Sequence, residues 1–388
     1  MVLLNTKLNI RTDVRWAFTY FVIVVCLGIF MRSVQVVDYP FEFNYRNIVH
    51  THSHLALLGF VYVLLSAILV RTFIPLNAQL HKRYQWLFYI TQLSVLGMLC
   101  SFPFQGYGAV SISFSSVFIF CTYFFAKFFM KYATSPFVKM GIWYLILSSL
   151  GIWLMPVTIV KYGKFSDMYM CAIAFFLHFQ YNGFMLSSLM GLFIKKYGWE
   201  VQYPQLIKRV FILFQAGIIG SLFISWVGYF SYPIYYIVGG ASVLIWLIAV
   251  VMILRLYLKT QPKSFLATVF ISFFIAKVVM MFTGAFPVLT PYLFKNIDLL
   301  ISYLHFNFLG IVTIGLLLFL EEVYKVNRWL VYLFLFAFIT TEVLITYKGF
   351  SVIVNYPIFS NFYEWLWAFT ALFYFPAIGW FIGSFKIK

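Results

Sequence analysis

Histidine is the residue type in this sequence whose spacing points most directly to chemistry. One local pattern, a histidine followed five residues later by a glycine, occurs as His54–Gly59, His178–Gly183 and His305–Gly310. The histidines are separated by 124 and 127 residues, which indicates an internal repeat. Neutral imidazole is a suitable ligand for haem iron and for copper. We therefore take these three histidines as candidate metal or haem ligands.

Two further histidines precede the first copy of the pattern, in the run Val49–His54. In a helix, His50 and His54 share a face, whereas His52 points elsewhere. His54 is the better internal ligand because it occupies the repeat position, and His50 is the second candidate. We expect His52 to make a hydrogen bond or to face the outer water layer. The sequence leaves the choice among the three open.

The composition defines the elements that must position these side chains. Of the 388 residues, 64% are hydrophobic and only 10% are charged. Soluble domains are roughly half apolar and about a quarter charged. The excess therefore predicts lipid-facing surface, and it excludes a secreted disulfide scaffold, a nucleic-acid-binding domain and a large extramembrane enzyme. We expect an all-α polytopic protein whose main partner is the lipid bilayer.

The sequence contains twelve apolar runs separated by short polar segments. A membrane span needs about 20 residues, so these runs predict twelve spans. The predicted spans are 16–37, 50–70, 84–105, 108–130, 137–160, 168–194, 207–230, 233–255, 264–287, 298–320, 328–348 and 361–384. The histidine pattern falls on the second, sixth and tenth spans, which run in the same direction. We thus predict one integral membrane domain, 1–388, with three pseudo-repeats of four helices, at about 1–135, 136–260 and 261–388.

The net charge of +17 can be divided by side of the membrane. With the N-terminus inside, 20 of the 27 Lys and Arg residues lie on the inner side, among them Lys7, Lys325 and Lys388. Six lie outside: Arg32, Arg46, Lys161, Lys164, Lys295 and Lys348. By the positive-inside rule, both termini face the cytoplasm. We expect a multi-pass protein of a bacterial cytoplasmic (inner) membrane, and the charge needs no nucleic-acid partner.

Twelve spans in three sets of four, with histidines on the second, sixth and tenth, resemble subunit I of the haem-copper oxidases. Nitric-oxide-reductase large subunits share this plan, and NnrS-type membrane proteins are similar to it. The segment His178–Gly183 resembles the reductase form of the sixth-helix motif. The resemblance implies that His54 (or His50) and His305 ligate a b-type haem. It also implies that His178 is a haem-pocket residue or a ligand of the active-site metal.

The sequence departs from that family at the metal centre. The seventh span, 207–230, lacks the family's pair of adjacent histidines. Asn307 stands where the tenth helix would carry its second histidine, and Asn182 stands where the reductases tend to carry a carboxylate. The copper site is therefore incomplete, and reduction of oxygen or nitric oxide by the family's route is not expected.

Two charged residues lie deep in apolar runs, Lys277 in the ninth span and Glu342 in the eleventh. At similar depth they could neutralise each other, which would remove much of the cost of burial. A proton relay, or recognition of an anionic group such as a haem propionate, is the functional alternative. Tyr181, Asn182 and Asn307 flank the histidines and are candidates for supporting hydrogen bonds.

The leading hypothesis is a haem-binding membrane protein for electron transfer, gas sensing or haem and metal handling. Its electron partner would be a quinone or another membrane redox subunit. The alternative is a transporter or assembly factor that keeps the oxidase-like scaffold without haem. A terminal reductase subunit is the third reading, and the missing histidines oppose it. Whether the protein is an enzyme is left open by the sequence.

Overall fold

The computed structural model describes residues 10–75, 77–261, 263–321, 323–324 and 326–386, and the regular elements of this part are helices. Lys7, Lys325 and Lys388 of the charge assignment lie outside the described residues. Eleven helices are long and apolar enough to cross a membrane. They are Arg11–Ser33, Tyr45–Phe73, Ala78–Gln105, Ala109–Met130, Pro136–Tyr162, Pro204–Trp226, Pro233–Lys259, Phe265–Thr283, Ile297–Leu320, Arg328–Ile353 and Phe362–Ser384. The prediction of an all-helical, polytopic membrane protein is thus confirmed.

The predicted span at 168–194 also exists as a helix, but it is not one of these eleven. It runs without interruption through α7 (Asp167–His178), η2 (Phe179–Leu186) and α8 (Ser187–Lys196). Its centre carries His178, Gln180 and Asn182, and these polar side chains make it less apolar than the other spans. The count of twelve spans therefore stays a prediction.

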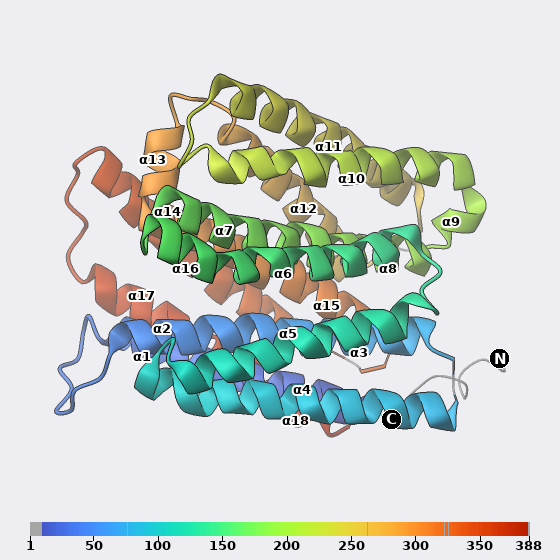
Figure 1. Ribbon diagram of the computed structural model, residues 1–388, viewed down its shortest axis with the longest axis horizontal. Coiled ribbons are helices and arrows are strands. Elements are labelled where there is room, and N and C mark those ends of the chain that lie inside the picture. Colours follow the sequence, from blue (N-terminus) through green and yellow to red (C-terminus); the bar gives the residue numbers. More distant parts are fainter. Residues whose placement is uncertain (1–9, 76, 262, 322, 325, 387–388) are drawn as a thin grey trace. The chain divides into compact units, whose positions relative to one another are not determined.

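The other elements take the following bounds along the chain, with η denoting a π-helix (Figure 1). They are α1 (Arg11–Ser33), α2 (Tyr45–His54), η1 (Leu55–Tyr62), α3 (Val63–Phe73), α4 (Ala78–Gln105), α5 (Ala109–Met130), α6 (Pro136–Tyr162), α9 (Trp199–Gln202), α10 (Pro204–Trp226), α11 (Pro233–Lys259), α12 (Phe265–Thr283), α13 (Thr290–Lys295), α14 (Ile297–His305), η3 (Phe306–Val312), α15 (Thr313–Leu320), α16 (Arg328–Ile353), α17 (Phe362–Ala371) and α18 (Tyr374–Ser384).

The three helices that carry the repeated histidines all start in the same way. Asn44, Ser166 and Asn296 precede α2, α7 and α14, and each accepts a hydrogen bond from a backbone N–H of the first turn. Such N-caps satisfy amide groups that have no partner inside the helix. Asn77 and Asn327 cap α4 and α16 in the same way, so this helix start is shared beyond the three histidine-bearing helices, and the three pseudo-repeats stay a prediction.

The chain forms two compact units. The first unit consists of residues 1–132 and 316–388. In it, α1 packs against η1, α3, α17 and α18, and α4 packs against α2 and α5. An aromatic core joins these helices: the ring of Phe21 lies 4.5 Å from that of Phe60 and 5.9 Å from that of Trp380. Fully buried aromatic side chains contribute strongly to the stability of such a core.

The second unit consists of residues 133–315. In it, α6 packs along α7, η2 and α8, while α10 lies beside α11 and α12 contacts both α11 and η3. Trp246 of α11 is fully buried and packs its ring on Phe214 and Phe274. A Cβ atom at Gly217 would overlap the Trp246 side chain, so this glycine permits the close approach of α10 and α11.

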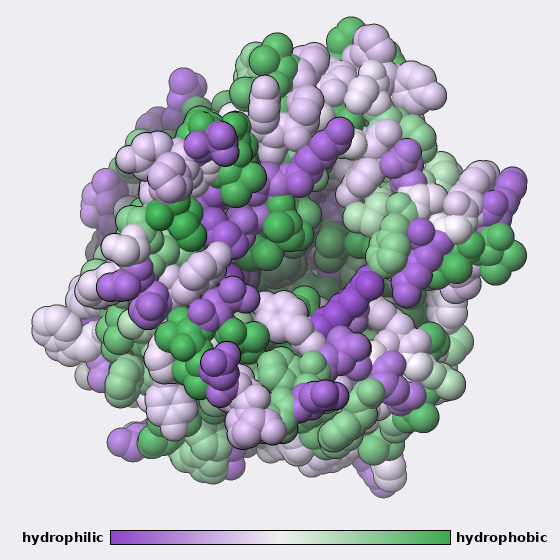
Figure 2. All heavy atoms as spheres, turned by 90° about the vertical axis from the view of Figure 1, so that its left-hand side faces the viewer, coloured by the Kyte–Doolittle hydropathy of each residue, from purple (hydrophilic) through white to green (hydrophobic). Residues whose placement is uncertain are grey.

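Hydrophilic and apolar side chains are distributed differently over the surface. On the face that Figure 2 shows, purple hydrophilic residues are interspersed with apolar ones. By contrast, large apolar side chains such as Leu93, Phe124 and Val343 are exposed along the bodies of α4, α5 and α16. Exposed apolar surface on long helices is what a lipid environment requires.

Candidate functional site

Each repeated histidine is the last α-helical residue before a π-helix. His54 ends α2 before η1, His178 ends α7 before η2, and His305 ends α14 before η3. The π-helix is rare and is found frequently at functional sites. Its wider turn is visible in one side-chain contact: the Thr313 hydroxyl donates to the carbonyl of Phe308, five residues earlier, at 2.8 Å. The repeat seen in the sequence therefore coincides with a repeated change of helix type.

The imidazole of His54 has one nitrogen engaged. Its Nδ1 lies 2.8 Å from the carbonyl oxygen of His50, and because a carbonyl only accepts, Nδ1 must carry the proton. The Nε2 atom makes no hydrogen bond to any residue that the structure describes. The ring lies against Phe102, with 4.3 Å between ring centroids. In the neutral form of this half-buried imidazole, the lone pair is therefore on Nε2.

The neighbouring histidines follow the helical geometry expected for them. His50 and His54 share a face, since both rings contact Tyr107, at centroid distances of 4.6 and 5.7 Å. His52 points to a different helix, where its Nδ1 lies 3.0 Å from the carbonyl oxygen of Val24 in α1. His50 and His54 therefore form one candidate site, and His52 joins α2 to α1.

The imidazole of His178 has both nitrogens engaged. Its Nε2 donates to the carbonyl oxygen of Ile218 at 2.8 Å. Its Nδ1 is consequently the acceptor of the neutral ring, and it lies 3.0 Å from the hydroxyl of Ser225 and 3.2 Å from Nδ2 of Asn182. The side chain is fully buried. In this arrangement, a metal bond to either nitrogen would require the loss of a hydrogen bond.

The partners of His178 come from α10, which corresponds to the predicted seventh span. Ile218 offers a main-chain carbonyl, and Ser225 offers a hydroxyl two turns further on. An interhelical hydrogen bond of this kind stabilises helix packing inside a membrane. The geometry therefore makes His178, the last residue of α7, a link to α10.

Polar side chains surround the start of η3 as well. His305 is half-buried. Asn307 is fully buried, and its Nδ2 donates to the carbonyl oxygen of Tyr303 at 2.7 Å. The ring of Tyr303 faces that of Tyr181 in η2, with 6.5 Å between centroids. The second unit thus brings Tyr181, Asn182 and Asn307 into one polar layer with His178, across the contact between η2 and η3.

This polar layer contains acceptor atoms that no described residue satisfies. The carboxamide groups of Asn182 and Asn307 use their nitrogens, and the oxygen of each remains without a hydrogen bond among the described residues. Buried polar groups are usually satisfied by protein or by ordered water. The layer is therefore polar enough to hold water.

The two predicted intramembrane charges belong to different units, Lys277 to the second and Glu342 to the first. Lys277 is fully buried on α12. Its Nζ lies 3.8 Å from the centroid of the Trp246 ring and 3.4 Å from the sulfur of Met281. A cation over the face of an indole is stabilised by the ring quadrupole. The pairing of Lys277 with Glu342 stays a prediction.

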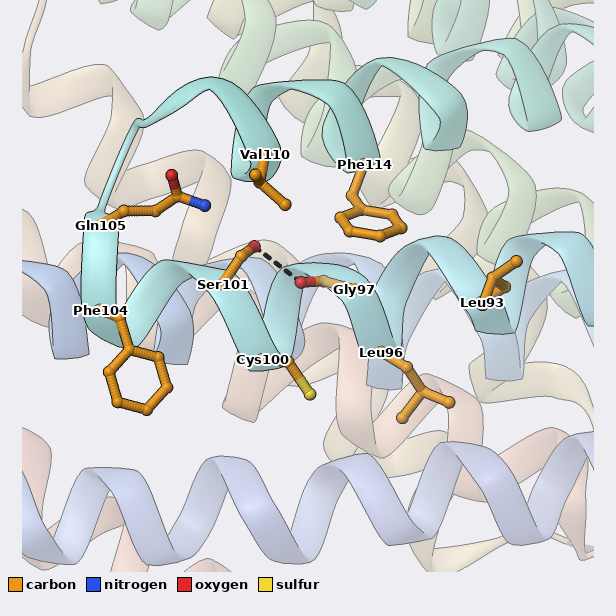
Figure 3. Close-up of a pocket in the computed structure, with 9 residues that line it drawn as sticks. All are labelled: Leu93, Leu96, Gly97, Cys100, Ser101, Phe104, Gln105, Val110 and Phe114. Atoms are coloured by element: carbon orange, nitrogen blue, oxygen red, sulfur yellow. Dashed lines mark hydrogen bonds between the residues drawn. The ribbon is translucent and has the colours of Figure 1, made fainter.

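An open apolar groove of about 510 Å³ lies between α4 and α5. Figure 3 shows Val110 and Phe114 of α5 facing Gly97 and Ser101 of α4, where the Ser101 hydroxyl donates to the Gly97 carbonyl. None of the described residues that line it is a histidine. The groove is thus separate from the histidine chemistry, and its apolar lining suits contact with lipid.

One buried ionisable pair was not predicted from the sequence. Asp13 of α1 accepts a hydrogen bond from the hydroxyl of Tyr84 of α4, at 2.8 Å, and both residues are buried. Asp13 lies between Arg11 and Arg15, so the sequence suggests only a charged helix end. The predicted span starts at Trp16, whereas α1 already starts at Arg11. Asp13 therefore lies inside the helix.

Comparison with known proteins finds no matching family model and no curated protein with significant similarity. Among the residues that the structure describes, no three His, Cys, Asp or Glu side chains gather as a metal site. The fit of a haem can be judged on the histidines alone. His54 fits an axial ligand because its Nδ1 is anchored and its Nε2 is available, whereas His178 does not fit one without losing a hydrogen bond.

Proposed function

We propose that this multi-pass membrane protein binds a b-type haem and that His54 would hold its iron. One observation carries the proposal: the Nδ1 proton of His54 is held by the carbonyl of His50, which leaves the Nε2 lone pair available. Metal-bound histidines have this hydrogen bond on their other nitrogen almost without exception. The porphyrin supplies most ligands of a haem iron, so one imidazole provides an anchor, whereas a bare ion needs several side chains.

We propose His305 as a second candidate haem ligand, within its own unit. The support is its register, since it ends α14 before η3 as His54 ends α2 before η1. A haem held by imidazole would supply electron-transfer chemistry, and its electron partner would be a quinone or another membrane redox subunit. Loss of one ligand would open a coordination position for a diatomic gas.

The charge distribution supports a topology in which both termini face the cytoplasm of a bacterial cell. In that topology the histidines lie nearer the outer surface, because α2 follows the outward-running α1. Cysteine labelling at positions in the loops tests this orientation. A cysteine at Asp38 should react with an impermeant reagent in intact spheroplasts, and one at Gln79 should react only after the membrane is opened.

The proposed haem is tested by visible spectroscopy of the protein purified in detergent from a haem-replete host. We expect a Soret band and sharp bands in the dithionite-reduced spectrum. His54→Ala should remove at least nine-tenths of the haem per protein, and His305→Ala should remove it or convert it to a gas-binding form. His81→Ala, outside the repeat, is the matched control and should keep the full haem content. A wild-type protein without haem would overturn the proposal.

The second candidate function is a transporter or assembly factor that uses no haem. It is favoured by the second unit, where His178 is fully hydrogen-bonded and the ammonium of Lys277 lies against Trp246. Ionisable groups in membrane spans often mark substrate or proton pathways. A colourless preparation that is folded and monodisperse would move this candidate to first place.

A further inference from the structure

The first unit contains a buried carboxyl group that the haem proposal does not use. Asp13 is only 5% exposed, and the Tyr84 hydroxyl donates to its Oδ2. Among the described residues, no cation pairs with this carboxyl. The guanidinium of Arg15, on the same helix, lies instead over the ring of Phe385, 4.6 Å from its centroid. A carboxyl group in a membrane protein without a countercharge is costly to keep and points to a function.

Polar groups continue inward from this pair. α4, which carries Tyr84, packs against η1, which carries Tyr62, and Ser66 of α3 and Cys121 of α5 belong to the same unit. All of these side chains are buried. The groups come from α1, η1, α3, α4 and α5, so five elements of the first unit carry buried polar side chains.

The stripe of α4 that carries Tyr84 also carries Gln92, two turns further on. Gln92 is 3% exposed, and neither its amide nitrogen nor its oxygen has a hydrogen-bond partner among the described residues. The hydroxyl of Ser66 is also unsatisfied there. Buried groups of this kind usually bind internal water. With a rise of 1.5 Å per residue, the stretch from Tyr84 to Gln92 extends over about 12 Å.

We propose that Asp13 and Tyr84 form a proton-binding site at the start of a hydrated polar track that leads to η1. A hydronium ion gives its proton to the carboxylate, which yields the carboxylic acid and one water molecule. The carboxylic acid then donates to the oxygen of Tyr84, which frees the Tyr84 hydroxyl proton to turn to the next water or hydroxyl. The acid proton passes to Tyr84 as the Tyr84 proton passes on, so Asp13 returns to the carboxylate. Tyr84 from α4 faces the carboxyl directly, η1 with the buried Tyr62 packs against α4, and Arg15, on the same helix as Asp13, lies over the ring of Phe385.

The proposal is tested by infrared difference spectra of the full chain in detergent, recorded between acidic and alkaline buffer. The wild type should show the carbonyl band of a protonated carboxylic acid that disappears in alkali. Asp13→Asn should abolish this band. Asp38→Asn, which changes an exposed aspartate of the loop after α1, is the matched control and should leave the band unchanged.

Tyr84→Phe keeps the carboxyl but removes its hydrogen bond, so the band should persist at a higher frequency. If Asp13→Asn fails to fold, Tyr84→Phe still tests the proposal. A band that survives in full in Asp13→Asn, or no titrating band in the wild type, would overturn the proposal. A band that keeps its frequency in Tyr84→Phe would do so as well. Haem absorbance has no part in the measurement, so the result is independent of the proposed function.

Discussion

His54 and His178 occupy the same position in two copies of one sequence pattern, but their rings make different hydrogen bonds. We call the surroundings of His54 the first histidine layer and those of His178 the second. At the start of η1, His54 bonds within its own helix and leaves Nε2 available. At the start of η2, His178 uses both nitrogens, one of them on the backbone of α10. The comparison teaches that a repeated position does not by itself make a histidine a ligand. The partners of the ring decide whether the residue can bind a metal or joins two helices.

The largest expected difference between the two layers is in stability. His178→Ala leaves buried groups on Ile218, Ser225 and Asn182 without their partner and creates a cavity, so we expect it to lower the free energy of unfolding by about 3 kcal/mol. His54→Ala removes one hydrogen bond within a helix and should cost about 1 kcal/mol. Thermal unfolding in detergent, of protein produced in a haem-deficient host, measures both without a contribution from bound haem. Equal losses would mean that the two layers do not differ as described.

The glycines of the two layers should differ in the same direction. A Cβ atom at Gly183 would lie 2.5 Å from the Cβ of Tyr144, whereas one at Gly59 would lie 2.9 Å from the ring of Tyr20. We expect Gly183→Ala to cost about 2 kcal/mol, at the middle of the range for overpacking, and Gly59→Ala to cost less. The midpoint of thermal unfolding orders the two variants, and the reverse order would contradict the difference in packing.

A smaller effect is expected from the hydroxyl that supports His178. Ser225→Ala removes one of the two donors to Nδ1, and Asn182 remains as the other, so the cost should be about 1 kcal/mol. Ser53→Ala, which affects an exposed hydroxyl beside His54, is the control and should be neutral within about 0.5 kcal/mol. If both serine variants unfold alike, the hydrogen bond to His178 contributes nothing measurable.

The smallest loss is expected at the buried lysine of the second unit. Lys277→Met keeps much of the side-chain length and removes a charge that no carboxylate neutralises among the described residues of its unit. We expect no loss of stability, or a gain, because replacing buried charge by apolar volume is often neutral or stabilising. Thermal unfolding again provides the measurement. A loss of more than about 2 kcal/mol would show that the contact with Trp246 is a main support of the layer.

The positions of most long helices were predictable because they follow from the position and length of the apolar runs in the sequence. The limits of α4, α5 and α11 lie within a few residues of the predicted spans at one or both ends. The change from α to π geometry after each histidine was not predictable. In a π-helix each backbone hydrogen bond spans one residue more than in an α-helix, and this change has no signature in the local amino-acid composition. The histidine register was visible in the sequence because it depends on spacing alone.

The side-chain chemistry was less accessible to sequence reasoning. The partners of His178 lie 40 and 47 residues further along the chain, and one of them is a backbone carbonyl that no motif can reveal. The partner of Asp13 lies 71 residues away and is a tyrosine, a residue too common in this chain to attract notice. Contacts of this kind are set by how helices pack, which residue spacing along one helix does not encode.

The three π-helices have a consequence for how the chain tolerates insertions and deletions. A π turn holds about one residue more than an α turn, so the removal of one residue from η1, η2 or η3 can be absorbed by a change to α geometry. The same removal within α4 or α10 would rotate every later side chain of the helix by about 100°. Single-residue length changes should therefore be accepted directly after the histidines and rejected elsewhere in the spans.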